Sequence, residues 1–110
     1  MANRYYDADD ARHRMEMSKL APADFKAWME LNQIPGKDHG TIPPRTREIV
    51  AIAVAHATGC PYCIESHVKK AKALGVTKEE VAEAVLLSAA LCAGAAAAHG
   101  GLAMKFFEAE

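Results

Sequence analysis

Residues 44–75 read PRTREIVAIAVAHATGCPYCIESHVKKAKALG and contain two predicted helices separated by a glycine. The first, about 44–58, follows a proline-rich loop and is apolar nearly all round, which predicts burial in the centre of the domain. It stops at Gly59, because glycine readily adopts the conformation that ends a helix. The second runs from about Pro61 to Ala73, with Gly75 in the position of a left-handed C-cap.

Helices are also predicted upstream of this pair. Asp9 or Asp10 caps a short helix that runs to about Leu20, and a second, amphipathic helix extends from Pro22 to about Asn32. The segment 34–44 holds three prolines and two glycines, which predicts a loop.

Downstream, Thr77 and Glu80 form a predicted capping box. The helix that they begin is expected to run for roughly twenty residues to Ala98. The segment 99–101, His-Gly-Gly, is expected to end it, and a short tail helix follows. Because no segment alternates with period two, the predicted fold class is all-α, in one domain that spans residues 1–110.

Composition excludes several functional classes. The chain has 51% hydrophobic residues, 25% charged residues and a formal net charge of -1, so it lacks the basic excess of a nucleic-acid-binding protein. The apolar stretches around 49–57 and 84–98 are expected to be too short or too interrupted by polar residues to span a bilayer. Acidic residues occupy the N-terminal segment where a signal peptide needs an apolar core. We therefore expect a cytoplasmic protein that binds neither nucleic acid nor a membrane.

The reactive chemistry concentrates in residues 59–67, where Cys60 and Cys63 form a CxxC pair and His67 follows one turn later. On a helix these three side chains share one face, so both sulfurs and the imidazole can converge. A helix N-terminus favours a thiolate at Cys60, whereas His67 is placed to take the proton of Cys63. The pattern predicts thiol redox chemistry and leaves open which sulfur attacks first.

Two other interpretations of the CxxC pair remain. Zinc takes four protein ligands in structural sites and three plus water in catalytic ones. Cys60, Cys63 and His67 supply three, and a further ligand would come from His39, His56 or His99, but no second CxxC or HxxxH motif accompanies them. Alternatively, both cysteines are inert. We expect no metal and no cofactor.

Glu48 lies in the most apolar helix of the chain, where a carboxylate is costly unless it is paired or used. A buried carboxylate makes a good proton shuttle. The alternative is a surface ion pair with Arg45 or Arg47. Helix rise separates Glu48 from Cys60 by roughly 17 Å along the axis, so a meeting requires the helices to fold back or cross.

The run 89–98 consists almost entirely of alanine and glycine, which bury little area per residue. Either a second surface is buried by self-association, or this helix packs tightly inside the monomer. Cys92, within the run, is interpreted as a small buried hydrophobe. His99 is placed at a helix end and His39 in a loop, neither with an assigned role. His56 and Tyr62 are candidates for lining the site.

The spacing from Glu48 through Cys60-Pro61-Tyr62-Cys63 to His67 and Gly75 resembles the alkylhydroperoxidase D-like core of the carboxymuconolactone decarboxylase family. The PPRTREIVA segment that leads into the first helix and the aromatic helix before it agree with this resemblance, which covers about residues 20–100.

The resemblance implies an all-helical fold that assembles as a homotrimer or a homohexamer. It implies that Cys63 attacks a hydroperoxide, that Cys60 resolves it, and that His67 and Glu48 relay protons. The reductant implied is a dithiol, of lipoyl type in the best-known branch.

Tyr62 departs from the peroxidase branch, which can carry a second histidine there. Two alternatives stay open beside a thiol peroxidase or disulfide reductase: a decarboxylase of a carboxylated lactone, which does not depend on a redox CxxC, and a non-enzymatic, redox-sensing helical oligomer.

Overall fold

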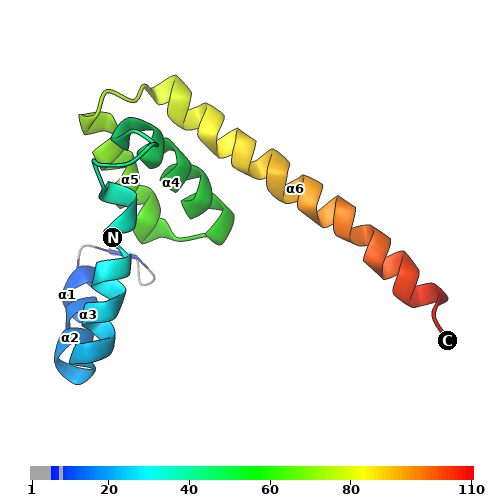
Figure 1. Ribbon diagram of the computed structural model, residues 1–110, viewed down its shortest axis with the longest axis horizontal. Helices are drawn as coiled ribbons and strands as arrows, with labels where there is room; N and C mark the ends of the chain where they lie inside the picture. The colour runs from blue at the N-terminus through cyan, green and yellow to red at the C-terminus, as the bar shows by residue number, and fades with distance from the viewer. Residues whose placement is uncertain (1–5, 8) are drawn as a thin grey trace.

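The computed structural model describes residues 6, 7 and 9–110, and it contains helices and no strand within them. In chain order these are α1 (Asp10–Met15), α2 (Met17–Leu20), α3 (Pro22–Leu31), the 3-10 turn η1 (Ile34–Gly36), α4 (Pro44–Thr58), α5 (Pro61–Ala73) and α6 (Lys78–Glu108) (Figure 1). The predicted all-α class is confirmed. The expected first helix is two short helices, α1 and α2, which meet at Glu16.

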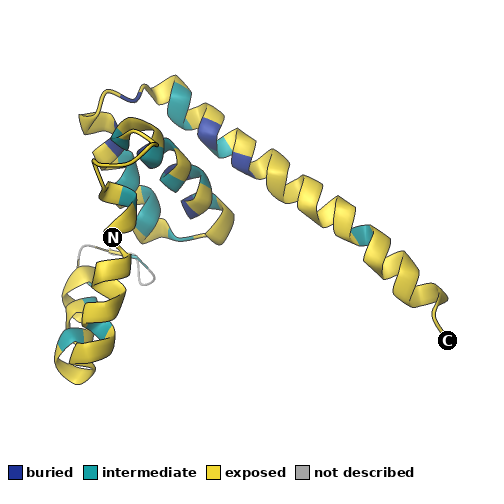
Figure 2. Ribbon diagram, in the orientation of Figure 1, coloured by how far each residue is buried: buried dark blue, intermediate teal, exposed yellow. Residues whose placement is uncertain are grey.

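The core lies where α5 and the first turns of α6 pack against α4. Ile52, Ala71, Val76 and Ala84 are buried together there, and four partly buried hydrophobic side chains pack against them: Ile49, Val68, Val81 and Val85. Ser88 Oγ donates a hydrogen bond of 2.8 Å to the Ala53 carbonyl and fixes α6 against α4. Figure 2 shows that burial is confined to this part of the molecule, while most of α6 is exposed.

Two glycines end the helices of the central pair as predicted. Gly59 (φ 68°) and Gly75 (φ 82°) both adopt the left-handed conformation that glycine tolerates without strain. The predicted capping box also forms: Thr77 Oγ1 accepts from the Glu80 N–H at 3.2 Å, and Glu80 Oε1 accepts from the Thr77 N–H at 2.9 Å.

An ion pair ties the start of α6 to the start of α4. The Arg45 guanidinium donates to the Glu80 carboxylate and, at 3.4 Å, to the Gly75 carbonyl. The hydrogen bond from Arg45 holds the pKa of Glu80 down at about 2, against an ordinary value of 4.5. Arg45 is thus a partner of Glu80 and not of Glu48.

The expected break at 99–101 is wrong, because α6 continues without interruption from Lys78 to Glu108. Gly100 and Gly101 both lie inside the helix, and neither has a positive φ. Glycine ends a helix when the chain needs a left-handed residue, and here good helix formers on both sides carry the helix through at a cost of about 1 kcal/mol per glycine.

The longer helix also corrects the expectation that no stretch is suited to span a bilayer. By length and composition alone α6 is long and apolar enough to cross a membrane. The core helix of a soluble protein can be as long and as apolar, but such a helix is mostly buried. Only 11% of the most apolar segment of α6 is buried within the chain. The helix therefore carries a large apolar surface that its own chain leaves uncovered.

Alanine substitutions at Gly75 and Gly101 should have opposite effects on stability. Gly75→Ala places a Cβ on a left-handed residue and should cost about 1–2 kcal/mol. Gly101→Ala, in a regular helix with open space around it, should stabilise by about 0.5–1 kcal/mol. Urea unfolding measures both, and a destabilised Gly101→Ala variant would contradict the continuous helix.

Glu80→Gln should lower stability at neutral pH but not near pH 2. A depressed pKa means that the folded state binds this proton more weakly than the unfolded state, so the contribution is present above pH 4.5 and is lost as pH falls toward 2. Glutamine keeps the capping hydrogen bond and removes only the charge. The check is thermal unfolding of both proteins between pH 2 and 7, with Glu79→Gln in the same helical turn as the control.

Candidate functional site

The turn at Gly59 folds α5 back against α4 and brings Glu48 to His67. Glu48 lies near the start of α4 and His67 in the middle of α5, yet Glu48 Oε2 is 2.6 Å from His67 Nδ1. The side chain of Glu48 is 4% exposed and that of His67 15%. The fold thus brings Glu48 of α4 into contact with α5, which the helix spacing in the sequence did not establish. The predicted burial of Glu48 is confirmed.

The hydrogen bond has a defined direction. An ionised carboxylate only accepts, so the Nδ1–H of His67 donates to Glu48. In the neutral imidazole that donates from Nδ1, the other ring nitrogen, Nε2, is the one able to take a proton. The arrangement is that of an imidazole general base oriented by a buried carboxylate.

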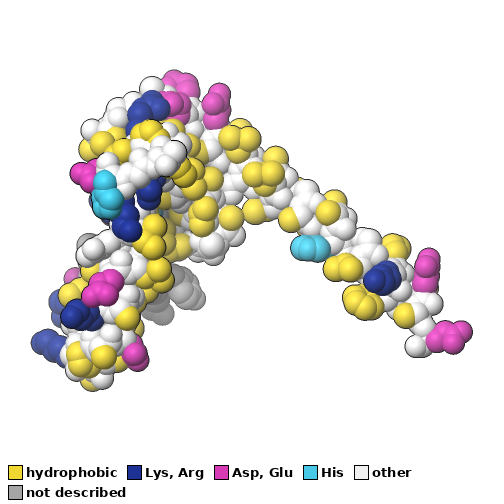
Figure 3. All heavy atoms as spheres, viewed as in Figure 1, with side chains coloured by type: hydrophobic (Ala, Val, Ile, Leu, Met, Phe, Trp, Pro, Cys, Tyr) yellow, Lys and Arg dark blue, Asp and Glu magenta, His cyan; other side chains and the backbone are white. Residues whose placement is uncertain are grey.

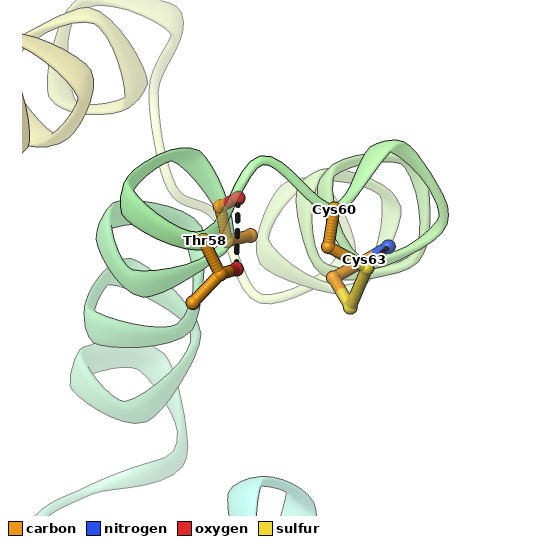
Figure 4. The surroundings of a disulfide bond; sticks show 4 residues. Thr58, Cys60 and Cys63 are labelled. Atoms are coloured by element: carbon orange, nitrogen blue, oxygen red, sulfur yellow. Dashed lines mark hydrogen bonds between the residues drawn. A yellow bond between two sulfur atoms is a disulfide. The ribbon is translucent and has the colours of Figure 1, made fainter.

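The two cysteines of the CxxC motif form a disulfide at the N-terminus of α5, in the turn drawn in Figure 4. Cys60 is the N-cap residue, and its Sγ accepts a hydrogen bond of 3.2 Å from the Cys63 N–H. The neighbouring Thr58 donates at 3.3 Å to the Ala55 carbonyl, which closes the end of α4 beside the turn (Figure 4). Both sulfurs therefore lie at the positive end of a helix, where a thiolate is favoured.

An apolar groove of about 350 Å³ opens beside this motif and is lined by Cys63 and His67 but not by Cys60. Its wall is almost wholly apolar and includes Ile34, Ile42, Val50, Val54 and Thr58. A small molecule in the groove would lie against Cys63 and His67 together.

Arg47 holds one wall of the groove in place. Its Nε donates to the Ile42 carbonyl at 3.0 Å and its Nη1 to the Ile34 carbonyl at 2.8 Å, so the loop before α4 folds over the groove. Gly40 permits this approach, because a Cβ there would lie 2.7 Å from Arg47 Nη2. Sequence reasoning considered Arg47 only as a partner for Glu48, and no local pattern marks a bond to carbonyls that lie 5 and 13 residues away.

Comparison with known proteins identifies the family. The model of the carboxymuconolactone decarboxylase family matches residues 22–105. The chain belongs to this family.

Its relatives include "Uncharacterized protein 4 in cox locus" of Paracoccus denitrificans, 40% identical over 84% of this chain and 83% of the relative. An uncharacterized protein of Cupriavidus necator is 26% identical over 84% of this chain and 81% of its own length. "Alkyl hydroperoxide reductase AhpD" of Mycobacteroides abscessus is 36% identical over 68% of this chain but only 41% of the relative. No solved structure matches the chain.

In this member of the carboxymuconolactone decarboxylase family, the two further pocket candidates lie outside the groove lining. His56 lies in the last turn of α4, and its Nδ1 is 2.8 Å from the Ile52 carbonyl one turn earlier. Tyr62 lies on the other side of the motif, where its ring meets the Tyr6 ring edge-on at 5.1 Å and Arg14 at 5.4 Å. A hydrogen bond to Asp10 raises the pKa of Tyr62.

The structure also places three residues outside the predicted site: Cys92, His39 and His99. Cys92 is a free thiol and is exposed, so the expectation that it is buried is wrong for the single chain. The part of α6 around Cys92 extends beyond α4 and is exposed. His39 is exposed beside Asp38, and His99 lies within α6 and not at a helix end. In the described part of the chain, residues 6–7 and 9–110, no three His, Cys, Asp or Glu side chains gather as metal ligands would.

A double-mutant cycle should separate the two members of the buried pair. Glu48→Leu alone should destabilise by about 1–3 kcal/mol, because the Nδ1–H of His67 loses its partner in a largely buried site. Glu48→Leu combined with His67→Leu should recover most of that loss, since both polar groups are then gone. Urea unfolding of the four proteins gives the coupling, and strictly additive single losses would rule the interaction out.

Proposed function

We propose that this protein is a thiol-dependent hydroperoxidase or disulfide reductase in which Cys63 attacks the oxidant. The observation that carries the proposal is the groove beside the motif, which is lined by Cys63 and His67 but not by Cys60. Glu48 forms a hydrogen bond with Nδ1 of the same histidine. The relative named alkyl hydroperoxide reductase supports the same reaction class.

The first step makes the attacking thiolate and consumes the peroxide. His67 Nε2 takes the proton of Cys63, and the thiolate attacks the terminal oxygen of the hydroperoxide. The O–O bond breaks, an S–O bond forms, and the leaving alkoxide takes a proton from the imidazolium to become an alcohol. Glu48 stabilises the imidazolium that exists between these two proton transfers.

The second step forms the disulfide. The thiol of Cys60 attacks the sulfenic acid on Cys63, water leaves, and the S–S bond that joins these residues is made. A dithiol reductant, of lipoyl type by resemblance, then returns both thiols through a mixed disulfide and leaves as a cyclic disulfide. We place the reaction in the cytoplasm, with no metal or cofactor, in a homotrimer or a homohexamer.

Trapping the sulfenic acid tests the assignment of the two cysteines. After one equivalent of an alkyl hydroperoxide, reduced Cys60→Ser should hold a sulfenic acid on Cys63 that dimedone captures, whereas Cys63→Ser should consume no peroxide. Mass spectrometry of the labelled protein gives both results, and Cys92→Ala, which removes the third thiol and keeps a small apolar side chain, serves as the matched control. Full peroxide turnover in Cys63→Ser would overturn the mechanism.

The same samples distinguish the alternatives. A decarboxylase of a carboxylated lactone would release CO₂ from such a substrate, and this activity would survive both cysteine substitutions. A redox sensor would form the Cys60–Cys63 disulfide once per chain and show no turnover when a dithiol is added.

A further inference from the structure

The single chain exposes far more surface than a compact protein of its size. A folded monomer of 11.8 kDa exposes about 5,900 Å², whereas this chain exposes 8805 Å². Its radius of gyration is 18.0 Å, against about 13 Å for a compact chain of this length. The excess of about 2,900 Å² is over three times the roughly 800 Å² that each partner buries in a standard interface.

Much of the uncovered surface belongs to α6, which projects from the body (Figures 1 and 3). The face that packs on α4 through Val81, Ala84, Val85 and Ser88 continues along the helix at every third or fourth residue. We call its continuation the distal stripe, which consists of Cys92, Ala95, His99, Leu102 and Phe106. Within it, Leu102 is 49% exposed and Phe106 70%.

Among the residues that the structure describes, none covers the distal stripe, whose members are all exposed. The start of α6 is held on α4 by Ser88 and by the Arg45–Glu80 ion pair, and from there the helix runs unbroken to Glu108. It contains no left-handed residue at which it could turn back toward the body.

A second apolar surface of the same chain is also open. Val50 and Val54 lie on α4 in the wall of the groove. Val50 is 51% exposed and Val54 is 53% exposed. The thiolate chemistry proposed for Cys63 takes place beside them, in a groove that is open to water on one side.

We infer that the distal stripe of α6 from a second copy of this chain closes the groove over Cys63 and His67. One contact then covers both apolar surfaces, and the site is complete only in the assembly. Small residues around the stripe let the partner's helix approach α4 closely. The contact matters for function through the role proposed for Cys63 and His67, but it forms whether or not the protein turns over peroxide.

The second copy is favoured over a membrane as the occupant. Insertion of α6 into a bilayer would bury the helix but leave Val50 and Val54 exposed. Two exposed carboxylates of α6, Glu83 and Glu108, lie on the side opposite the stripe, where a partner's chain packed on the stripe would leave them in water.

Light scattering of the full chain, without detergent, tests the assembly. The wild type should have at least twice the 11.8 kDa mass of one chain, and Phe106→Glu or Leu102→Glu should lower it to that of one chain. Met104→Glu adds the same charge to an equally exposed residue off the stripe, and it should keep the wild-type mass. A monomeric wild type would overturn the inference, and flotation of the wild type with lipid vesicles would assign α6 to a membrane instead.

Thiol labelling tests whether the partner closes the groove. In a Cys60→Ser/Cys92→Ala background, which keeps a small apolar side chain in the stripe, only Cys63 reacts, and a bulky maleimide should label it much faster once Phe106→Glu has dissociated the assembly. The Met104→Glu control should label as slowly as the parent. If dissociation leaves the rate unchanged, the assembly exists without closing the site. None of these readouts needs peroxidase activity, so failure of the proposed function and failure of this inference are seen separately.

Discussion

The hydrogen bond between Glu48 and His67 is the interaction around which the central helices are arranged. A carboxylate that is 4% exposed is costly unless it is paired, and the partner it needs lies on a different helix. The chain must therefore reverse direction between α4 and α5, and the left-handed conformation of Gly59 permits this reversal. The same turn places the CxxC motif at the start of α5, so the constraint that satisfies Glu48 also builds the site.

Local signals in the sequence were enough to predict much of this fold. Gly59 and Gly75 end helices because only glycine adopts their backbone conformation without strain, and Thr77 with Glu80 caps α6 within four residues. The redox motif was recognisable for the same reason, since its spacing on one helix is a local property. The burial of Glu48 followed from its apolar neighbours in sequence.

The remaining features depend on contacts between distant residues. The groove is made by a loop that Arg47 draws over α4, and that interaction has no local pattern. The sequence predicts too short an α6 because two adjacent glycines usually end a helix, but they do so only where the chain turns, and here it does not. Cys92 was expected to be buried because alanine-rich helices are usually packed, whereas in one chain this part of α6 has nothing to pack against.

The central claim is that the Glu48–His67 pair activates Cys63. Rapid-mixing measurement of the rate at which the reduced protein reacts with an alkyl hydroperoxide tests it most directly, with wild type and Glu48→Gln compared at the same pH. Glutamine still hydrogen-bonds His67 but does not stabilise the imidazolium, so the rate constant should fall by about 10²-fold. An unchanged rate constant in Glu48→Gln would contradict the account.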